Sequence, residues 1–281
     1  MKKVFAVILH YRDKALTRQC LTSLQKVQKK NFKLKTVVID NDKKNLGFAA
    51  GNNVGIREAQ KQGADYILLL NNDTTVAPDF LIKMLAAAQN DQAGIVAPKI
   101  YFAPGYEYHQ TEYKPSEQGK VFWYAGGQID WANVLCSHRG VDEVDHGQYD
   151  RQMATDFASG CCLLTKREVL DQVGLLDQRY FLYLEDVEFC QRVKKAGFKI
   201  IYQPQAEIWH YNASSSQVGG GLHDYFITRN RLLFGLAYAP WRAKLGLIKE
   251  SARLLITGRP WQKAGVRDFY LKKFNQGSWH D

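Results

Sequence analysis

Three polar residues, Asn71-Asn72-Asp73, end a short and fully apolar run that begins at Tyr66. A run of this length, followed by a helix start at Pro78-Asp79, predicts a buried parallel strand. Ligands of open α/β sheets bind beyond the carboxyl ends of the strands, so the Asp73 carboxylate is expected to face a ligand. A hard carboxylate there suits Mg²⁺ or Mn²⁺ holding a phosphate. The competing interpretation is a turn or capping Asp.

A second carboxylate, Asp40, follows a shorter apolar run at 37–39, so Asp40 and Asp73 are expected at the same rim of the sheet. Between them lies a glycine-rich segment, Asn45-Leu46-Gly47-Phe48-Ala49-Ala50-Gly51-Asn52-Asn53-Val54-Gly55-Ile56. Its glycines would let the backbone approach a ligand, and the following helix would offer N–H groups to an anion. The glycine spacing differs from the dinucleotide fingerprint, so the segment alone is a generic loop.

The pair Glu185-Asp186 follows the aromatic run Tyr180-Phe181-Leu182-Tyr183 and opens a predicted helix. Helix N-termini stabilise carboxylates, so one interpretation is a helix cap. The functional interpretation is a general base, shielded by Phe181 and Tyr183, that takes a proton from an acceptor hydroxyl. His210 stands alone after Trp209, and a lone histidine is more often structural than a metal ligand.

In their order along the chain, these motifs resemble the family 2 glycosyltransferases of the GT-A type, especially the bacterial rhamnosyltransferase-like branch that builds surface polysaccharides. The resemblance covers residues 3–235. Its motifs are Asp40-Asn41, Asn45-x-Gly47-Phe48-Ala49-x-Gly51-x-Asn53-x-Gly55, Leu70-Asn71-Asn72-Asp73-Thr74, Ser159-Gly160-Cys161-Cys162-Leu163-Leu164, Gly174-x-x-Asp177-x-x-Tyr180-Phe181-x-Tyr183-x-Glu185-Asp186 and Trp209-His210.

The resemblance implies a role for each matching position. Asp186 corresponds to the catalytic base, and Asp73 with His210 to the site of the divalent metal, Mg²⁺ or Mn²⁺. The implied donor-binding residues are Asp40, Asn45, Gly47, Gly51, Asn53, Asn72 and Asp73, and the acceptor-side candidates are Glu185, Tyr183 and Asp156. The chain departs from the family pattern at Asn71, where the first Asp of the DxD motif often stands, and also at Asp42 and Arg12.

The reaction implied by the resemblance is a single in-line displacement that inverts the anomeric carbon. The donor would be a nucleotide-diphosphate sugar, with dTDP, UDP and GDP all open, and rhamnose is one candidate sugar. The acceptor would be a glycan or a polyprenyl-linked glycan in cell-surface polysaccharide synthesis. A metal would neutralise the leaving diphosphate as a Lewis acid, and the transition state would be oxocarbenium-like.

Composition limits the remaining choices. The net charge of +10 favours anionic partners, and 46% hydrophobic residues are ordinary for a globular protein. The odd count of five cysteines, without a metal-type spacing, favours a reduced intracellular protein. No apolar stretch approaches the roughly 18 residues of a membrane span, and the N-terminus resembles a first strand. We therefore expect a cytoplasmic or peripheral protein at the inner face of the plasma membrane, and no nucleic-acid partner.

The elements that would position these residues follow from hydrophobic periodicity. Strands are expected at 4–9, 37–39, 66–70 and 95–97, alternating with helices at 14–27, 50–62 and 78–88, which predicts a parallel sheet with crossover helices. Residues 101–155 are expected to be loop-rich, with short strands near 121–124 and 128–131. A strand at 158–165, helices at 168–173 and 186–196, a strand at 198–202 and a basic helical end complete the pattern.

The expected fold is therefore α/β of the GT-A type: a Rossmann-like, mostly parallel sheet flanked by helices, with a helical C-terminal extension. The catalytic domain is expected over 1–235, with the nucleotide-sugar half at 1–100 and the acceptor and catalytic half at 101–235. The extension at 236–281 interleaves basic residues with Trp, Leu and Phe, as interfacial helices do on anionic lipid. It could equally pack on the core or form a homodimer.

Two rival functions remain at this level. A nucleotidyltransferase shares an α/β core and metal use, but it would need a glycine-rich loop with a basic clamp after the first strand. His10-Tyr11-Arg12-Asp13 offers one basic clamp candidate and no glycine. A non-enzymatic polyanion- or carbohydrate-binding protein would use the positive charge, but it gives no reason for the Glu185-Asp186 pair.

Overall fold

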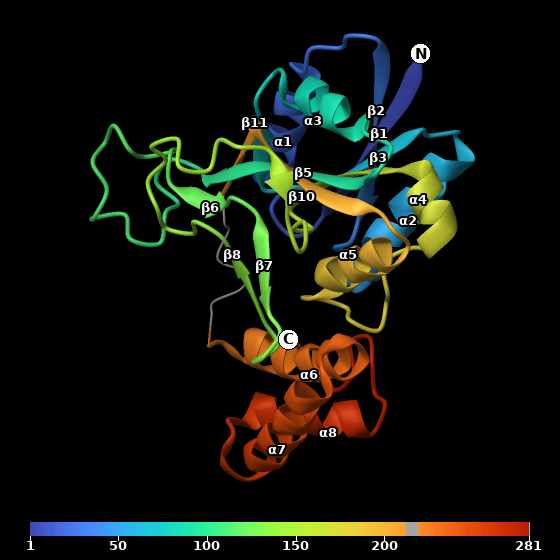
Figure 1. Cartoon of the computed structure of the whole chain (residues 1–281). Helices are drawn as coiled ribbons and strands as arrows, with labels where there is room; N and C mark the ends of the chain where they lie inside the picture. Colours follow the sequence, from blue (N-terminus) through green and yellow to red (C-terminus); the bar gives the residue numbers. More distant parts are fainter. Residues whose placement is uncertain (212–218, 281) are drawn as a thin grey trace.

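The computed structural model describes residues 1–211 and 219–280, and its centre is a mixed sheet (Figure 1). The strand order is β2-β1-β3-β10-β5-β11-β4, with β6 paired to β5 and β9 paired to β11. The strands are β1 (Lys2–His10), β2 (Phe32–Asp40), β3 (Tyr66–Asn71), β4 (Thr74–Val76), β5 (Ala93–Phe102), β6 (Phe122–Tyr124), β9 (Met153–Ala154), β10 (Cys162–Lys166) and β11 (Lys199–His210).

Helices cover both faces of the sheet. They are α1 (Lys14–Gln25), α2 (Gly47–Lys61), α3 (Phe80–Ala88), α4 (Arg167–Val173) and α5 (Glu185–Lys195). Figure 1 shows α1 and α3 on one side of the sheet and α2, α4 and α5 on the other. The sheet separates these layers, and Val4 to Ile8 of β1 are all fully buried because both faces of the strand are covered.

The sheet differs from a continuous parallel sheet at β10. β1 pairs in parallel with β2 and β3, and β11 pairs in parallel with β5, as the alternating pattern predicts. β10 lies antiparallel between β3 and β5, so these two strands are not neighbours. A short apolar run does not encode its direction or partners, which explains why the sequence pattern missed this insertion.

Two expected strands have different bounds. The strand expected at 158–165 begins only at Cys162, and the apolar residues before it form a buried irregular segment. The strand expected at 198–202 is β11, which continues to His210. Its register against β5 shifts between Gln203 and Glu207, and such a bulge accommodates Pro204, which has no backbone N–H to donate.

The long excursion after β5 carries β6 and a hairpin of β7 (Gly127–Asp130) and β8 (Leu135–His138), close to the short strands expected there. A buried ammonium holds the excursion against the sheet. Lys99 Nζ lies 2.6 Å from Asp145 Oδ2 and 2.5 Å from Asp150 Oδ1. The pairing compensates the cost of burying the Lys99 charge.

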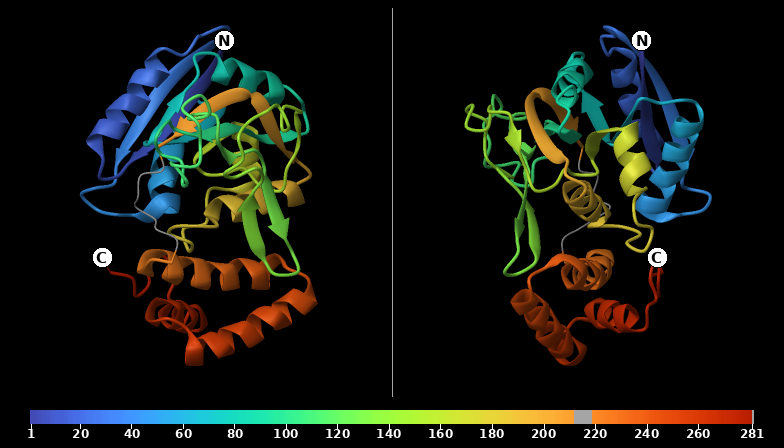
Figure 2. Two further views of the ribbon diagram at one scale, coloured as in Figure 1. Left: turned by 90° about the vertical axis from the view of Figure 1, so that its left-hand side faces the viewer. Right: turned by 45° about the vertical axis from the view of Figure 1, so that its right-hand side comes forward.

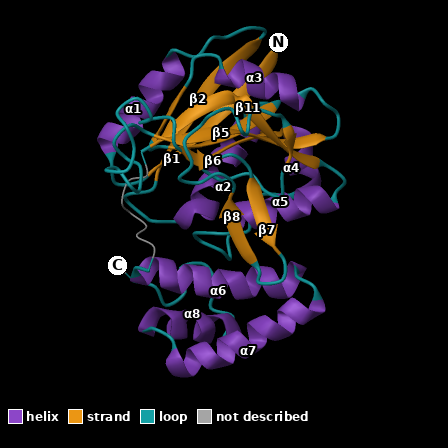
Figure 3. Cartoon of the chain, turned by 60° about the vertical axis from the view of Figure 1, so that its left-hand side comes forward, coloured by secondary structure: helices purple, strands orange, loops and turns teal. Residues whose placement is uncertain are grey.

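Three C-terminal helices form a separate layer beneath the sheet: α6 (Gly221–Tyr238), α7 (Trp241–Thr257) and α8 (Pro260–Tyr270) (Figures 2 and 3). The expected boundary at residue 235 falls inside α6, so in the structure this layer begins at Gly221. α6 faces the α/β part, and α7 and α8 lie beyond it. Among the described residues, no helix is both long enough and apolar enough to cross a bilayer.

Candidate functional site

The candidate site lies at the carboxyl ends of β1, β2 and β3. The parallel register pairs His10 with Asp40 and Leu9 with Asn71, so these strands end side by side. Asp40 and Asp73 therefore lie at the same end of the sheet, Asp40 on β2 and Asp73 just after β3, with β1 between these two strands.

Strand pairing brings His210 to Asp73. β4 pairs antiparallel with β11, with Thr74 opposite His210, and the Tyr211 N–H donates to the Asp73 carbonyl oxygen at 2.8 Å. His210 Nε2 then lies 3.3 Å from Asp73 Oδ1. The ring of Trp123 packs edge-on against the imidazole. Residues 137 positions apart in the sequence thus share one site because β4, a strand that sequence periodicity did not predict, aligns them.

This pair fits a divalent cation bound together with substrate phosphate. The donor set is a carboxylate oxygen and an imidazole nitrogen, and His210 Nδ1 is buried with no hydrogen-bond partner in the described part of the chain. Mg²⁺ is usually held by one or two carboxylates plus substrate phosphates and water, not by a full protein cage. These two side chains could therefore hold such a cation.

A second group of metal-type side chains lies at the same rim. One ligand atom from each of His10, Asp40 and Asp42 falls within 4.8 Å of the others. His10 Nε2 lies 3.2 Å from Asp42 Oδ2, and its Nδ1 lies 2.7 Å from the Thr17 hydroxyl. His10 was not singled out from the sequence, although it ends the first apolar run just as Asp40 ends the second.

Asp186 sits in the first turn of α5, where the sequence placed it. Its Oδ2 accepts the Gly160 N–H at 2.7 Å, and its Oδ1 accepts the Val187 N–H at 2.8 Å. Burial raises the pKa of Asp186, and the backbone donors at Gly160 and Val187 oppose this shift. A carboxyl whose pKa is raised by burial is a stronger base than an exposed one, as general-base catalysis requires.

Glu185 is buried beside Asp186 and has a different environment. Burial, and then the charge of Asp186, raise the pKa of Glu185 well above its usual range. Its Oε2 has no hydrogen-bond partner within the described residues. The protonated form of Glu185 is therefore favoured, whereas Asp186 has backbone donors that stabilise its charge.

A single dipeptide connects the two carboxylate sites. Gly160 donates its N–H to Asp186, and the carbonyl oxygen of the next residue, Cys161, accepts the Asn71 N–H at 2.9 Å. Asn71 is two residues before Asp73. The charges of both Asp73 and Asp186 contribute to raising the pKa of Cys161, after burial. Through these two hydrogen bonds, the dipeptide Gly160-Cys161 links the Asp186 carboxylate to the strand end that precedes Asp73.

Gly47 is required by a close contact with the segment before Asp186. It has a φ of +78°, and a Cβ at this position would lie 2.4 Å from the Phe181 ring. The next residue, Phe48, donates its N–H to the Phe181 carbonyl oxygen at 2.6 Å. Asn45 Oδ1 accepts the Gly47 N–H at 2.9 Å and so orders the start of α2.

Other predicted donor residues have packing partners. Gly51 faces Leu9 of β1, and the buried Asn53 side chain exchanges hydrogen bonds with the backbone of Leu176 at 2.8 and 3.1 Å. We therefore leave Gly51 and Asn53 out of the donor site proposed below. Asn72 Nδ2 donates to the Thr17 hydroxyl at 2.9 Å. Among the acceptor-side candidates, the Tyr183 ring contacts His223 of α6.

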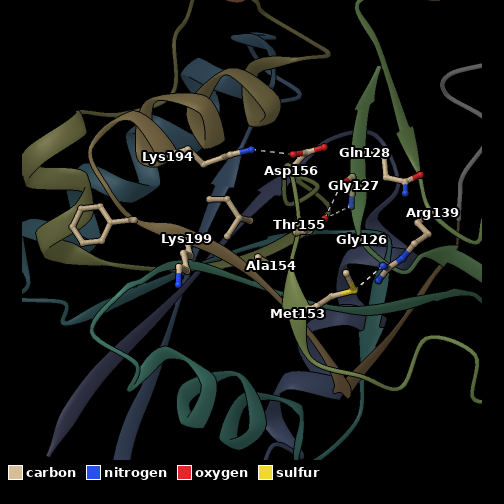
Figure 4. A pocket seen from close by; sticks show the side chains of 12 residues that line it. Gly126, Gly127, Gln128, Arg139, Met153, Ala154, Thr155, Asp156, Lys194 and Lys199 are labelled. Atoms are coloured by element: carbon tan, nitrogen blue, oxygen red, sulfur yellow. Dashed lines mark hydrogen bonds and ion pairs between the residues drawn. The ribbon is translucent and has the colours of Figure 1, made fainter. Parts of the chain in front are cut away.

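Asp156 lies in a pocket of about 420 Å³ between β7, β9, the end of α5 and the start of β11. Figure 4 shows its carboxylate joined to Lys194, with Arg139 on the opposite wall. Asp156 Oδ1 lies 3.0 Å from Lys194 Nζ, and its Oδ2 accepts the Ile129 N–H at 3.1 Å. Asp156 therefore pairs with the last turns of α5, whereas Asp186 lies at its first turn.

Sequence reasoning missed the function of Gly160. The residue stands in a recognised motif, Ser159-Gly160-Cys161, but no role was assigned to its N–H. A Cβ at Gly160 would lie 2.8 Å from the Phe48 ring and 3.5 Å from Asp186 Cβ. The sequence does not show that α2 and α5 approach each other closely at Gly160, because no local pattern encodes a contact between distant helices.

Comparisons with known proteins agree with this geometry. The profile of the glycosyltransferase-like family 2 matches residues 25–235. An N-acetylglucosaminyl-diphospho-decaprenol L-rhamnosyltransferase of Mycobacterium tuberculosis is 28% identical over 61% of this chain and 58% of that protein. The dTDP-rhamnosyl transferase RfbF of Shigella flexneri is 24% identical over 74% of this chain and 68% of that protein. The chain thus spans little more than half the length of the mycobacterial relative.

Among solved structures, GalNAc-T7 with UDP, GalNAc and Mn²⁺ has a TM-score of 0.57 at 14% identity. The match covers 92% of this chain and 58% of that chain. This likeness confirms the predicted fold, a GT-A type with a mostly parallel sheet and flanking helices.

Proposed function

Because the chain belongs to the glycosyltransferase-like family 2, we propose that it transfers a sugar from a nucleotide diphosphate to a hydroxyl group, with inversion at the anomeric carbon. The observation that carries this proposal is the pair of carboxylates joined through Gly160-Cys161: half-buried Asp186 on one side and Asp73 with His210 on the other. One base and one diphosphate-binding site are the groups that a single displacement needs.

Asp186 acts on the acceptor side in this mechanism. It takes the proton of the acceptor hydroxyl as the oxygen of that hydroxyl bonds to the anomeric carbon. The bond from that carbon to the diphosphate oxygen breaks, and its electron pair leaves with the nucleotide diphosphate. The Gly160 N–H, 2.7 Å from Asp186 Oδ2, fixes the direction of the carboxylate.

Asp73 and His210 act on the donor side. A divalent cation held by them would neutralise the leaving diphosphate as a Lewis acid. The Asp40 carboxylate at the end of β2 is exposed and is proposed to contact the nucleoside. Asn45, Gly47 and Asn72 shape the same rim through their hydrogen bonds and close contacts.

The relatives suggest the substrates to try first. Both names favour rhamnose as the sugar, the mycobacterial one in the L form, and the Shigella name favours dTDP as the nucleotide. The mycobacterial name favours a polyprenyl-diphosphate-linked sugar as the acceptor. We propose dTDP-rhamnose and a lipid-linked glycan on this basis, with UDP- and GDP-sugars as the alternatives.

We also propose peripheral contact with the inner face of the membrane through α7. Its side chains Trp241, Leu245, Ile248, Leu255 and Ile256 are exposed, and Arg242, Lys249 and Arg253 lie beside them. An exposed apolar row flanked by basic residues suits an anionic bilayer. Membrane contact would bring the rim near a lipid-linked acceptor, and homodimerisation through α7 is the alternative.

Calorimetric titration tests the donor site. We expect dTDP, UDP or GDP to bind the wild-type protein in the presence of Mn²⁺, and the Asp73→Ala variant to lose this binding by at least about tenfold. Asp171→Ala, at an exposed acid on α4, serves as the control and should bind as the wild type does. Failure of every nucleotide to bind would contradict the transferase proposal and favour a non-enzymatic carbohydrate- or polyanion-binding protein.

A second variant separates catalysis from binding. Asp186→Asn keeps the shape of the side chain but removes the base, so we expect turnover to fall by about 10²–10⁴-fold with nucleotide affinity unchanged. The assay follows release of the nucleotide diphosphate in the presence of donor and acceptor. Unchanged turnover in Asp186→Asn would remove Asp186 from the mechanism.

A further inference from the structure

A buried pair on α6, Arg229 and Asn230, faces the segment that leads to Asp186. Both side chains are fully buried, and Arg229 is the largest fully buried side chain among the described residues. Lone buried charges are costly, and burial lowers the pKa of Arg229. A guanidinium buried this deeply needs hydrogen-bond acceptors to offset the loss of water.

Those acceptors are backbone carbonyls of residues 179–184. Arg229 Nη2 donates to the carbonyl oxygens of Arg179 and Tyr180 at 3.1 and 2.9 Å. Asn230 Nδ2 lies 2.8, 2.7 and 2.9 Å from the carbonyl oxygens of Tyr180, Leu182 and Tyr183. Arg229 Nε donates to Asn230 Oδ1 at 3.0 Å, so the two side chains form one unit.

The remaining carbonyls of this segment also have donors. The Phe181 oxygen accepts the Phe48 N–H of α2, and the Leu184 oxygen accepts the Glu188 N–H of α5. Buried carbonyl groups need partners, and here α6 supplies those that the segment itself cannot. The segment is thus held between α2 on one side and the Arg229-Asn230 unit on the other.

The segment needs this support because its backbone is strained. Phe181, Tyr183 and Leu184 have φ values of +63°, +70° and +68°. The left-handed conformation is unfavourable for a non-glycine residue, and such residues persist only where surrounding contacts impose them. Leu184, the residue immediately before α5, sets the direction in which Glu185 and Asp186 leave the segment.

Arg229 is also fixed from its other sides. Its guanidinium packs against the rings of Tyr225 and Phe226 and donates through Nη1 to the Asn275 carbonyl oxygen at 2.6 Å. The Tyr225 hydroxyl in turn donates to Asp268 of α8 at 2.6 Å. Residues of α6, α8 and the segment after α8 thus fix the orientation of the guanidinium, which in turn contacts the strained segment.

We propose that Arg229 and Asn230 are positioning residues, which hold 179–184 in its left-handed conformation and so place Asp186 against the Gly160 N–H. The catalytic part of this inference rests on the proposed function, since it takes Asp186 as the base. The conformational part stands on the fold alone. The C-terminal layer is therefore a component of the active site and is required for turnover.

Hydrogen–deuterium exchange tests the conformational part without any activity. In Arg229→Lys, which keeps the charge but loses the planar fork, we expect faster exchange at the amides of Phe48, Gly160 and Glu188. Asn230→Asp keeps the size of the side chain and its acceptor for Arg229 but removes the donors, and it should give the same pattern. Peptides from β3 should exchange at the wild-type rate in both variants. Wild-type exchange throughout, in folded variants, would overturn the proposal.

Kinetics test the catalytic part. We expect kcat to fall by about 10²-fold in both variants, because a displacement of about 1 Å at a reacting group has an effect of that size. The dissociation constant for the nucleotide should stay within about twofold, since Asp73 and His210 are not moved. If kcat is retained while exchange is faster, the segment moves without affecting the base, and the catalytic part is wrong.

Arg231→Lys is the matched control on the same helix. Arg231 donates to the carbonyl oxygens of Asn133 and Val134 at 2.6 and 3.1 Å and pairs with Glu250. It thus fixes a different turn by the same kind of contact. We expect a comparable loss of thermal stability but wild-type exchange at 179–188. An equal fall of kcat in Arg231→Lys would show that any loosening of α6 impairs turnover, and it would contradict a specific role for Arg229 and Asn230.

If the wild-type protein transfers no sugar from any donor, the proposed function fails while the exchange result still decides the conformational part. If transfer occurs and the variants match the wild type in both measurements, the positioning role fails while the function stands. The two failures therefore give different results.

Discussion

Glu185 and Asp186 are adjacent in the chain, but the fold gives them opposite properties. Asp186 accepts N–H groups from Gly160 and Val187, which stabilise its ionised form against burial. Glu185 Oε2 has no hydrogen-bond partner among the described residues, and burial and then the charge of Asp186 raise the pKa of Glu185. Active sites often separate two carboxyl groups in this way, so that one is protonated and the other ionised. The pair supports Asp186, not Glu185, as the base.

Glu185→Gln should stabilise the fold at neutral pH. The pKa of Glu185 is higher in the folded state than in the unfolded state, so folding disfavours its charge. The stabilisation by its protonated form is complete below the unfolded pKa of about 4.3 and is lost as pH rises through the folded pKa. We therefore expect a higher Tm for Glu185→Gln at pH 7–8 and no difference near pH 4.

The control for this prediction is Glu168→Gln, which removes an exposed first-turn acid from α4. Because Glu168 is in water, its loss should leave Tm unchanged or slightly lower at neutral pH. Thermal denaturation of both variants across this pH range provides the comparison. A lower Tm of Glu185→Gln at pH 8 would mean that Glu185 is ionised and paired in the folded protein.

Residue type and position in the predicted elements together identified the candidate carboxylates but not the groups that support them. Asp40, Asp73 and Asp186 each end or begin a predicted element, and this position marks them as candidates. The support of Asp186 comes from Gly160 and, through the strained segment, from Asn230. An N–H group and a buried amide carry no local signal, because their role depends on which distant backbone they meet.

α2 illustrates how an element is fitted to the sheet. A Cβ at Gly55 would lie 2.3 Å from Val7 Cγ1, and one at Gly51 would lie 2.5 Å from Leu9 Cδ1. The two glycines let the helix approach β1 closely at the rim. The glycine-rich segment, whose glycines were expected to let the backbone approach a ligand, thus uses these two positions for helix–strand packing, and Gly47 for contact with Phe181.

Substituting alanine for two helical glycines should change stability in opposite directions. Gly55→Ala overlaps Val7, and overpacking of this kind costs typically about 1–3 kcal/mol, more than the gain of about 1 kcal/mol from helix propensity. Gly246→Ala on α7 meets no heavy atom within 4 Å, so propensity alone should raise the free energy of unfolding by up to about 1 kcal/mol. Urea denaturation of both variants measures the difference. Equal effects would mean that α2 can move away from β1 at no cost.

At the level of elements, the N-terminal half was predictable and the sheet order was not. β1, β3 and their helices follow from apolar runs and periodicity, since these elements are buried in regular ways. The antiparallel position of β10 depends on pairing with distant strands, since Thr165 lies opposite Ile95 of β5, 70 residues earlier, and Ile67 of β3, 98 residues earlier. The alignment of His210 with Asp73 requires β4, which is too short and too polar for a period to be recognised.

The molecule as a whole has two parts, the α/β part and the α6–α8 layer, which meet at residues 179–184. The α/β part supplies the rim, and the α6–α8 layer supplies the Arg229-Asn230 unit beneath residues 179–184 (Figure 3). Deleting the C-terminal helices would therefore remove support from the site as well as any docking surface. A test of membrane contact has to leave this layer intact and change only its outer side chains.

Such a test replaces exposed residues of α7, which lies on the side of α6 away from the sheet (Figure 2). We expect the wild-type protein to sediment with vesicles that contain anionic lipid and less with neutral vesicles or at high salt. The double variant Leu245→Ser with Ile256→Ser removes side chains that are 49% and 77% exposed. Each contributes about 1.5–3 kcal/mol when buried in lipid, so partitioning should fall at least tenfold.

Val54→Ser, which is 42% exposed on α2, should bind as the wild type does. Equal sedimentation of the wild-type protein and the double variant would contradict membrane docking through α7. Dimers that the double variant alone cannot form would instead assign this row to contact between two copies of the chain.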